Sequence, residues 1–269
     1  MFKHKPHHLA DIGFQRMLPS PALRPFVQWF WAIQSNRTIL EKRQEFMHAN
    51  GCLSILFNWG DELELTDSRY CQPVTLEKIG PYSRQIFLKG NIHTFGILFQ
   101  PGKAFHLFGI PMQDMISTDC LPLPDLLQLH EQLYQTPTLA SKTKQIELWL
   151  TKLLKSGETA SDIVPASLKL IEISAGNKLI QDLADIVGTT ERQLERLFNK
   201  EVGLSPKKYS RLIRLRQART ALKQANSTTL VDIANQTGFY DQAHFNHEFK
   251  KSVGITPKDY MSRHEKRNS

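Results

Sequence analysis

Two short stretches of this sequence carry polar side chains at the spacing of one helical face. The first comprises Arg192, Glu195, Arg196 and Asn199, and the second comprises Gln242, Ala243, Asn246 and His247. Arginine can form two parallel hydrogen bonds to guanine, and glutamate can accept a hydrogen bond from the amino group of cytosine. The second stretch also suits base edges or phosphates. On one isolated helix, the same pattern is typical of a solvated face with ion pairs four residues apart.

Repetition favours the first interpretation. Seven residues, Ala184, Gly188, Leu194, Phe198, Gly203, Pro206 and Tyr209, reappear in the same order as Ala234, Gly238, Phe245, Phe249, Gly254, Pro257 and Tyr260. The first pair repeats at a separation of 50 residues and the other five at 51. Two copies are too few for a solenoid, so the sequence predicts a duplicated small unit.

Each copy has the pattern of a helix, a glycine turn and a second helix. In the first copy, apolar residues recur at helical spacing before Gly188, which suits a tight turn. Thr190 then precedes Gln193 by three positions, a capping-box pattern that predicts the start of the second helix. Gly203 stands where that helix is expected to end. This is the helix-turn-helix arrangement, whose second helix can lie in a DNA major groove.

Between the copies, residues 206–223 are expected to form one helix with Pro206 in its first turn. About 18 residues at ~1.5 Å each span about 27 Å. Two recognition helices in successive major grooves need a separation of ~34 Å. The spacer, together with the width of the units at its ends, predicts that one chain can contact two adjacent grooves. Its exposed positions include Lys207 and Lys208.

Basic charge is confined to the same region. From residue 166 onward there are 18 Lys and Arg against 11 Asp and Glu, whereas the preceding 165 residues hold 16 against 15. This is the electrostatic footprint of a nucleic-acid partner. A membrane surface would also attract it, but no basic amphipathic helix of the interfacial type accompanies it.

The last hundred residues resemble the AraC/XylS family of bacterial transcription regulators. The motifs are SPKKY at 205–209, RLRQA at 214–218, GFYDQAHF at 238–245, FKK at 249–251 and GITPKDY at 254–260. The resemblance implies double-stranded DNA and RNA polymerase as partners, a cytoplasmic, nucleoid-associated location and no cofactor. It implies DNA contacts at Thr190, Arg192, Glu195, Arg196, Asn199, Lys207, Lys208, Gln242, Ala243, Asn246 and His247.

The second copy departs from the family pattern at two positions. Tyr240 stands where a small helix-capping residue is usual, and His247 stands where arginine is common. We therefore expect the second copy to bind bases weakly or mainly to hold phosphate. His244 matches a family histidine and is interpreted as a packing or capping residue.

Residues 18–100 have strand-like patterns. Residues 26–31, 53–57 and 92–99 are rich in aromatic and branched side chains and are separated by turn residues. They predict a small antiparallel barrel or sandwich. The aromatic residues Trp29, Trp31, Phe57, Trp59 and Phe99 would either line a small-molecule pocket or simply fill the core.

This region is also similar to a cupin-like sensor domain found ahead of AraC-type DNA-binding domains. The matching segments are 21–27 with Trp31, the turn at 50–52, and 99–104. The chain has Ala49-Asn50-Gly51 where Pro-Asp-Gly is typical, and Lys103 where a second glycine is usual. The resemblance implies an antiparallel β barrel and allows a small-molecule effector, but it supplies no ligand.

Three helices are expected after the barrel, at 102–116, 123–135 and 138–155. The apolar stripe of the third either packs on the barrel or pairs two chains, which would make a homodimer through residues 138–155. The expected organisation is a multidomain α and β protein. It has a β-rich sensor domain with flanking helices (1–157), a polar linker (158–165) and an all-α double helix-turn-helix domain (166–269).

Other functional classes receive little support. We expect no signal peptide and no membrane span, because the amino-terminal residues lack a continuous apolar segment. Cys52, Cys71 and Cys120 show no metal-ligand spacing, and no metal site is expected. The alternative function is an enzyme, a DNA alkyl-transfer repair protein fused to a DNA-binding unit, which requires a reactive cysteine in a basic setting.

Overall fold

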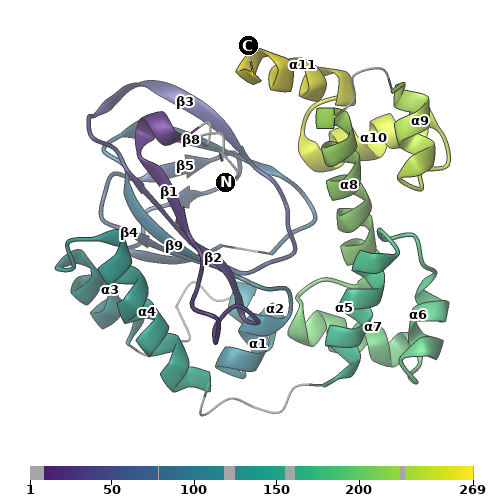
Figure 1. The fold of residues 1–269 in the computed structure, drawn as a ribbon, viewed down its shortest axis with the longest axis horizontal. Coiled ribbons are helices and arrows are strands. Elements are labelled where there is room, and N and C mark those ends of the chain that lie inside the picture. Colours follow the sequence, from purple (N-terminus) through teal and green to yellow (C-terminus); the bar gives the residue numbers. More distant parts are fainter. Residues whose placement is uncertain (1–8, 78, 118–124, 155–160, 225–227, 269) are drawn as a thin grey trace. The chain divides into compact units, whose positions relative to one another are not determined.

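The computed structural model describes residues 9–77, 79–117, 125–154, 161–224 and 228–268. The chain divides into two units. The first comprises residues 1–45, 52–78 and 85–160, and the second comprises 46–51, 79–84 and 161–269. The first unit holds nearly all of the strands and the second holds helices α5 to α11 (Figure 1).

The strands form two sheets. The five-stranded sheet has the order β1 (Phe14–Met17), β2 (Val27–Gln34), β9 (His93–Phe99), β4 (Ser54–Asn58) and β7 (Val74–Glu77). The four-stranded sheet has the order β3 (Ile39–Met47), β8 (Arg84–Gly90), β5 (Leu63–Leu65) and β6 (Arg69–Tyr70). A short 3-10 helix, Ala10–Ile12, precedes β1. The antiparallel β fold is confirmed, while closure of the two sheets into a barrel stays a prediction.

In the part of the first unit that the structure describes, four helices follow the strands: α1 (Lys103–Phe108), α2 (Met112–Ser117), α3 (Leu126–Tyr134) and α4 (Leu139–Leu154). The expectation of one helix over residues 102–116 was wrong. Gly109 adopts a φ of 68° after α1, and Pro111 follows two residues later, so the chain turns before α2 begins. The expected helix at 123–135 overlaps α3, although its first two residues lie outside the described ranges.

Helices α1, α3 and α4 cover one face of the five-stranded sheet (Figure 1). Side chains alternate between the two faces of a strand, so His93, Phe95, Ile97 and Phe99 of β9 share a face. Phe99 lies edge-on to Phe108 of α1, with ring centroids 5.5 Å apart. This face of β9 therefore forms the floor on which the helices pack.

Within its described residues, the second unit contains seven helices after residue 161: α5 (Ile163–Ile173), α6 (Ile180–Ile186), α7 (Glu191–Glu201), α8 (Pro206–Gln224), α9 (Leu230–Gln236), α10 (Gln242–Val253) and α11 (Pro257–Asn268). The expected spacer helix over 206–223 agrees with α8 to within one residue. The order is one helix pair, α6 and α7, then α8, then a second pair, α9 and α10 (Figure 1).

Two apolar cores hold these helices, and α8 contributes to both. Tyr209, Leu212 and Ile213 belong to the core around α6 and α7. Leu215 and Ala218, further along the same helix, belong to the core around α9 and α10. Because one continuous helix is buried in both cores, the two helix pairs are held at a fixed separation.

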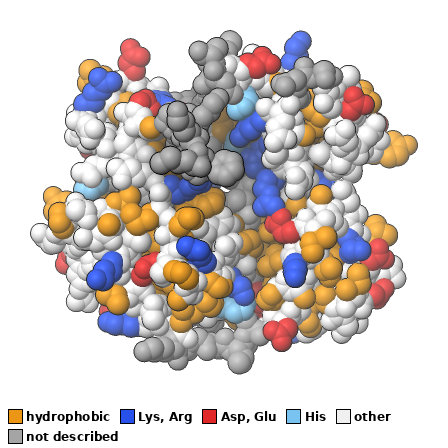
Figure 2. Space-filling view, in the orientation of Figure 1, with side chains coloured by type: hydrophobic (Ala, Val, Ile, Leu, Met, Phe, Trp, Pro, Cys, Tyr) orange, Lys and Arg blue, Asp and Glu red, His pale blue; other side chains and the backbone are white. Residues whose placement is uncertain are grey.

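Surface charge alone does not identify a binding surface. Figure 2 shows basic, acidic and apolar side chains interspersed over the visible face. Among the described residues, no helix has both the length and the apolar character that crossing a bilayer requires. A binding surface is therefore defined by the placement of individual side chains on α7, α8 and α10.

Candidate nucleic-acid interface

The first helix-turn-helix consists of α6, a turn at Gly188 and α7. Leu183 and Ala184 of α6 are buried against the same core as Leu194 and Phe198 of α7. Gly188 ends the first helix with a φ of 70°, a conformation that glycine adopts without steric cost. The small side chain of Ala184 and this turn allow the two helices to cross closely.

The start of α7 is capped by Thr190, as the sequence predicts. The Thr190 side chain accepts a hydrogen bond from the Gln193 backbone N–H at 3.2 Å. The reciprocal half of the expected capping box is replaced by another contact: Gln193 Oε1 accepts from Arg196 Nε at 3.2 Å. The Gln193 side chain therefore orients an arginine on the outward face of α7.

The outward face of α7 presents the predicted polar side chains. Arg192, Glu195 and Arg196 are exposed, and Asn199 is half-buried. Leu197, on the opposite side of the helix, is buried. An amphipathic helix with its apolar face in the core leaves this polar face available to a major groove.

The second helix-turn-helix repeats this design with α9, a turn at Gly238 and α10. Thr229 and Asp232 form a complete capping box at the start of α9. Gly238 adopts a φ of 77°, matching Gly188. Asp241 caps α10, with Oδ1 accepting from the His244 backbone N–H at 2.7 Å.

The cap residue Asp241 lies one residue after Tyr240, the position at which the family usually has a small capping residue. Tyr240 does not replace the cap, because Asp241 supplies it and Tyr240 is 89% exposed. The His244 ring lies edge-on to Phe239 with centroids 5.7 Å apart, which fits the expected packing role. The start of α10 is therefore as well formed as that of α7.

The outward face of α10 is more mixed than that of α7. Ala243 and His247 are exposed, whereas Gln242 and Asn246 are half-buried. The Asn246 Oδ1 atom is buried and has no hydrogen-bond partner among the described residues. His247 Nδ1 lies 3.6 Å from Glu248 Oε1. The structure thus places these four residues on one helix, and two of them, Ala243 and His247, are exposed to solvent.

The arginines of α8 bind within the protein, a role that was not predicted from the sequence. Arg211 Nε lies 2.8 Å from Glu248 Oε2 of α10, and Arg216 forms an ion pair with Glu172 of α5. The Arg214 guanidinium lies 5.9 Å from the Phe239 ring centroid. Burial lowers the pKa of Arg214 below its ordinary value. These side chains fix α8 to its neighbours.

Lys207 and Lys208 differ from those arginines. Both lysines lie in the first turn of α8 and are exposed. The Lys208 backbone N–H donates to Ser205 Oγ at 3.3 Å. Among the described residues, the Lys208 ammonium forms no ion pair. An exposed ammonium on a flexible stem is suited to a phosphate.

The aromatic residues proposed for a ligand pocket lie in different places. Phe57 and Phe99 are completely buried in the first unit. Trp31 lies over Gly96, on the sheet face opposite to Phe95. Trp29 is on the same face as Trp31, and the Arg16 guanidinium carbon lies 5.1 Å from the centroid of its ring. Trp59 alone of the five lines the described cavities. Ligand contact by all five residues stays a prediction.

Comparisons with known proteins agree with this geometry. The model of a helix-turn-helix domain matches residues 183–263, and the model of a domain of unknown function (DUF6597) matches residues 15–120. The transcriptional regulator GbdR of Pseudomonas aeruginosa is 39% identical over 80 residues, covering 30% of this chain and 22% of that protein. The transcriptional activator RhaR of Yersinia pestis is 31% identical over 140 residues, covering 51% and 46%.

A solved structure from Chromobacterium violaceum, titled a transcriptional regulator with an AraC-type DNA-binding domain, is also similar. It is 33% identical, with a TM-score of 0.36, and the match covers 38% of this chain and 91% of that one. This chain spans less than half the length of GbdR and of RhaR.

The fold and the two polar helix faces define a double helix-turn-helix protein with an amino-terminal β-rich unit. Its relatives are transcriptional regulators. Residues 183–263 form an AraC-type helix-turn-helix domain, and this is the region that the chain shares with them.

Proposed function

We propose that this chain is a sequence-specific DNA-binding transcription regulator that places α7 and α10 in two successive major grooves. The observation that supports this most is the equivalence of the two helix-turn-helix units: each second helix has a side-chain cap, an apolar buried face and a polar outward face. The 19 residues of α8 span about 28 Å at ~1.5 Å per residue. With the width of the units at its ends, α8 suits a groove separation of ~34 Å.

Each proposed contact has a defined task. Arg192, Glu195 and Arg196 of α7 would contact base edges, and Thr190 and Asn199 would lie at the flanks. Lys207 and Lys208 would bind phosphates. Gln242, Ala243, Asn246 and His247 would form the second contact, and half-burial of two of them favours a weaker base preference there.

The test uses the full chain. Duplexes are selected from a random pool, and the preferred sequence is mapped by hydroxyl-radical footprinting. We expect two protected segments about 10 base pairs apart on one face of the duplex. Inserting five base pairs between them should abolish simultaneous contact, because it rotates one groove away. A single protected segment that tolerates this insertion would contradict the two-groove arrangement.

The amino-terminal unit would control DNA binding, through a small molecule or by setting the oligomeric state. For a homodimer through residues 138–155, the support is exposed Leu148, at 59%. Ile146 and Leu150 of the same helix are buried within the unit, which accounts for that part of the stripe by core packing. Sedimentation of the full chain as a monomer at tens of micromolar would contradict the homodimer.

Contact with RNA polymerase, activation of transcription and a cytoplasmic, nucleoid-associated location follow from the proposed class. RhaR is named an activator, and the same direction is proposed here. A reporter promoter carrying the selected sequence should gain transcription when the chain is expressed. A fall in transcription would instead assign the chain to repressors.

The enzyme alternative has less support. Cys52 is buried, and its Sγ lies 3.1 Å from Gln28 Nε2; Cys71 is exposed, and Cys120 lies outside the described residues. Within the described ranges, no cluster of three His, Cys, Asp or Glu side chains is placed to hold a metal ion. Mass-spectrometric detection of an alkylated cysteine after incubation with alkylated DNA would support the enzyme alternative.

A further inference from the structure

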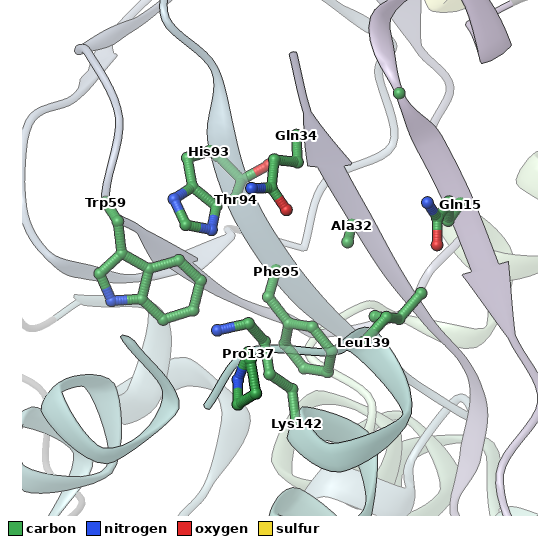
Figure 3. Close-up of a pocket in the computed structure, with 11 residues that line it drawn as sticks. Gln15, Ala32, Gln34, Trp59, His93, Thr94, Phe95, Pro137, Leu139 and Lys142 are labelled. Atoms are coloured by element: carbon green, nitrogen blue, oxygen red, sulfur yellow. The ribbon is translucent and has the colours of Figure 1, made fainter. Parts of the chain in front are cut away.

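A cavity lies in the first unit between the helix-covered face of the five-stranded sheet and the start of α4. Its volume is about 210 Å³, and its walls include Gln34, Trp59, His93, Phe95, Leu139 and Lys142. Figure 3 shows side chains from β2, β9, α4 and the turn after β4 directed toward one space. Because Phe95 and Trp31 lie on opposite faces of the sheet, the cavity is separate from the space between the two sheets.

Lys142 is the charged group of this cavity. The residue is 7% exposed, and its ammonium lies 4.6 Å from the centroid of the Trp59 ring. It donates a hydrogen bond to the backbone carbonyl of Leu133. Among the described residues it forms no ion pair with a carboxylate. Burying an ammonium without an anion costs free energy, and burial lowers the pKa of Lys142 accordingly.

The polar groups around Lys142 favour an anion. No Asp or Glu of the described ranges lines the cavity, whereas His93 and Gln34 offer donors beside the ammonium. His93 pairs with Gln34 across β9 and β2, which places both on the cavity face. A bound carboxylate would supply the negative charge that the protein does not place there.

The other walls are flat and apolar. Trp59 is held in place because its Nε1 donates to the His130 backbone carbonyl at 3.2 Å. The His130 ring stacks behind it with centroids 5.1 Å apart and an interplanar angle of 23°. Phe95 is fully buried and forms the floor. Trp59 and Phe95 therefore contribute flat apolar surfaces to the wall, which suit a planar ring.

We propose that this cavity binds a small aromatic monocarboxylate of about the size of benzoate. Its carboxylate would contact the Lys142 ammonium and His93, and its ring would lie against Trp59 and Phe95. The volume agrees, because a cavity of about 150 Å³ lined by apolar residues takes benzene. The binding of this ligand does not depend on the proposed function. An effect of the ligand on DNA affinity would rest on that function.

The test is calorimetric titration of the full chain with benzoate, phenylacetate and the neutral isostere benzamide. We expect benzoate or phenylacetate to bind at least ~10-fold more tightly than benzamide, a difference of about 1.4 kcal/mol. Lys142→Met should weaken the carboxylates by at least the same factor and leave benzamide unchanged. Lys144→Met, an exposed lysine on the same helix, is the matched control and should change nothing.

Three outcomes would overturn the proposal: no carboxylate binding at millimolar concentration, equal binding of benzamide, or equal losses in the two lysine variants. If Lys142→Met does not fold, Trp59→Phe provides the second test. Benzoate should quench tryptophan fluorescence of the natural chain, and this variant should lose the quench while keeping its unfolding transition. Persistence of the quench would place the ligand elsewhere. DNA affinity without ligand is measured on the same samples, so failure of this site is distinguishable from failure of DNA binding.

Discussion

Thr190 and Asp241, 51 residues apart in the sequence, occupy the same position at the start of α7 and α10, and each side chain accepts a backbone hydrogen bond three residues ahead. The acceptor distances are 3.2 Å at Thr190 and 2.7 Å at Asp241. An ionised cap also interacts favourably with the positive end of a helix. The second copy therefore has the stronger cap.

Removing each cap should destabilise the domain unequally. Thr190→Ala should cost about 1 kcal/mol of unfolding free energy, and Asp241→Ala more, toward ~2 kcal/mol. Asp241→Asn keeps an acceptor but removes the charge, so it should fall between Asp241→Ala and the natural chain. Denaturant unfolding followed by circular dichroism measures all three. Equal losses for the two alanine variants would show that charge at the cap is unimportant here.

The two turn glycines make a second matched pair. Gly188 and Gly238 have φ values of 70° and 77°, and an alanine in that conformation costs roughly 1–2 kcal/mol. A Cβ at Gly188 would meet nothing within 4 Å, whereas one at Gly238 would lie 1.8 Å from Asn177 Oδ1. Gly238→Ala should therefore be more destabilising than Gly188→Ala.

The additional destabilisation expected for Gly238→Ala over Gly188→Ala can be measured by a double-mutant cycle with Asn177. In an Asn177→Ala background, the added methyl group no longer meets the amide, so the cost of Gly238→Ala should fall to that of Gly188→Ala. Thermal unfolding of the natural chain, the Gly238→Ala and Asn177→Ala variants, the double variant and Gly188→Ala measures this. An unchanged excess would locate the strain in the backbone rather than in contact with Asn177.

The repeat allowed the helical domain to be predicted closely, because the seven matched positions mark the two turns, the buried faces of α7 and α10 and the start of α8. The cap of α10 at Asp241 was not predicted. Contacts between distant residues could not be predicted. Arg216 pairs with Glu172 at a separation of 44 residues, and nothing local distinguishes it from Lys208. Lys142 has the pattern of an ordinary helix-surface lysine until α4 is placed beside Trp59.

The β-rich unit was predicted less completely for a related reason. The apolar strands β2, β4 and β9 are recognisable because they are central and buried. Strand β3 carries four charged side chains in nine residues and shows no simple alternation of apolar and polar residues. Its pairing in the four-stranded sheet, rather than local propensity, makes it a strand.

Arg196 should determine base preference. Its Nε is held 3.2 Å from Gln193 Oε1, which leaves the rest of the guanidinium for a guanine edge. Arg196→Ala should cost ~1–3 kcal/mol at the preferred duplex and relax the choice at one base pair. Fluorescence anisotropy with the selected and a randomised duplex provides the comparison. Equal losses on both duplexes would mean that Arg196 contacts only phosphate.

Substitutions of the lysines and of the arginines of α8 should have different effects on the salt dependence of DNA affinity. Lys207→Ala and Lys208→Ala should each reduce the slope of log affinity against log salt by about 1, because a phosphate contact is lost. Arg216→Ala should leave that slope unchanged and lower stability by roughly 0–1 kcal/mol, since its ion pair with Glu172 is partly exposed. Titrations at several salt concentrations distinguish the two groups. A smaller slope for Arg216→Ala would place that arginine on the DNA.

Acidification should destabilise the first unit through His93. Burial, and then the charge of Lys142 from α4, lower the pKa of His93 below its ordinary value. The Tyr134 ring of α3 also faces it, with centroids 6.4 Å apart. In the unfolded chain the imidazole titrates near ~6.5, so below that pH the unfolded state binds more protons. Stability present above about pH 6.5 is therefore lost as the pH falls through the folded-state pKa.

The variant His93→Gln should reduce this loss, measured as the difference in unfolding temperature between pH 7.5 and 5.5. His247→Gln, which changes an exposed histidine of the other unit, is the control and should keep the full difference. Benzoate should oppose the effect, because a carboxylate beside His93 favours the imidazolium and should bind more tightly as the pH falls from 7.5 to 6. Benzoate affinity that is independent of pH in this range would separate His93 from the carboxylate and leave Lys142 as its sole charged contact.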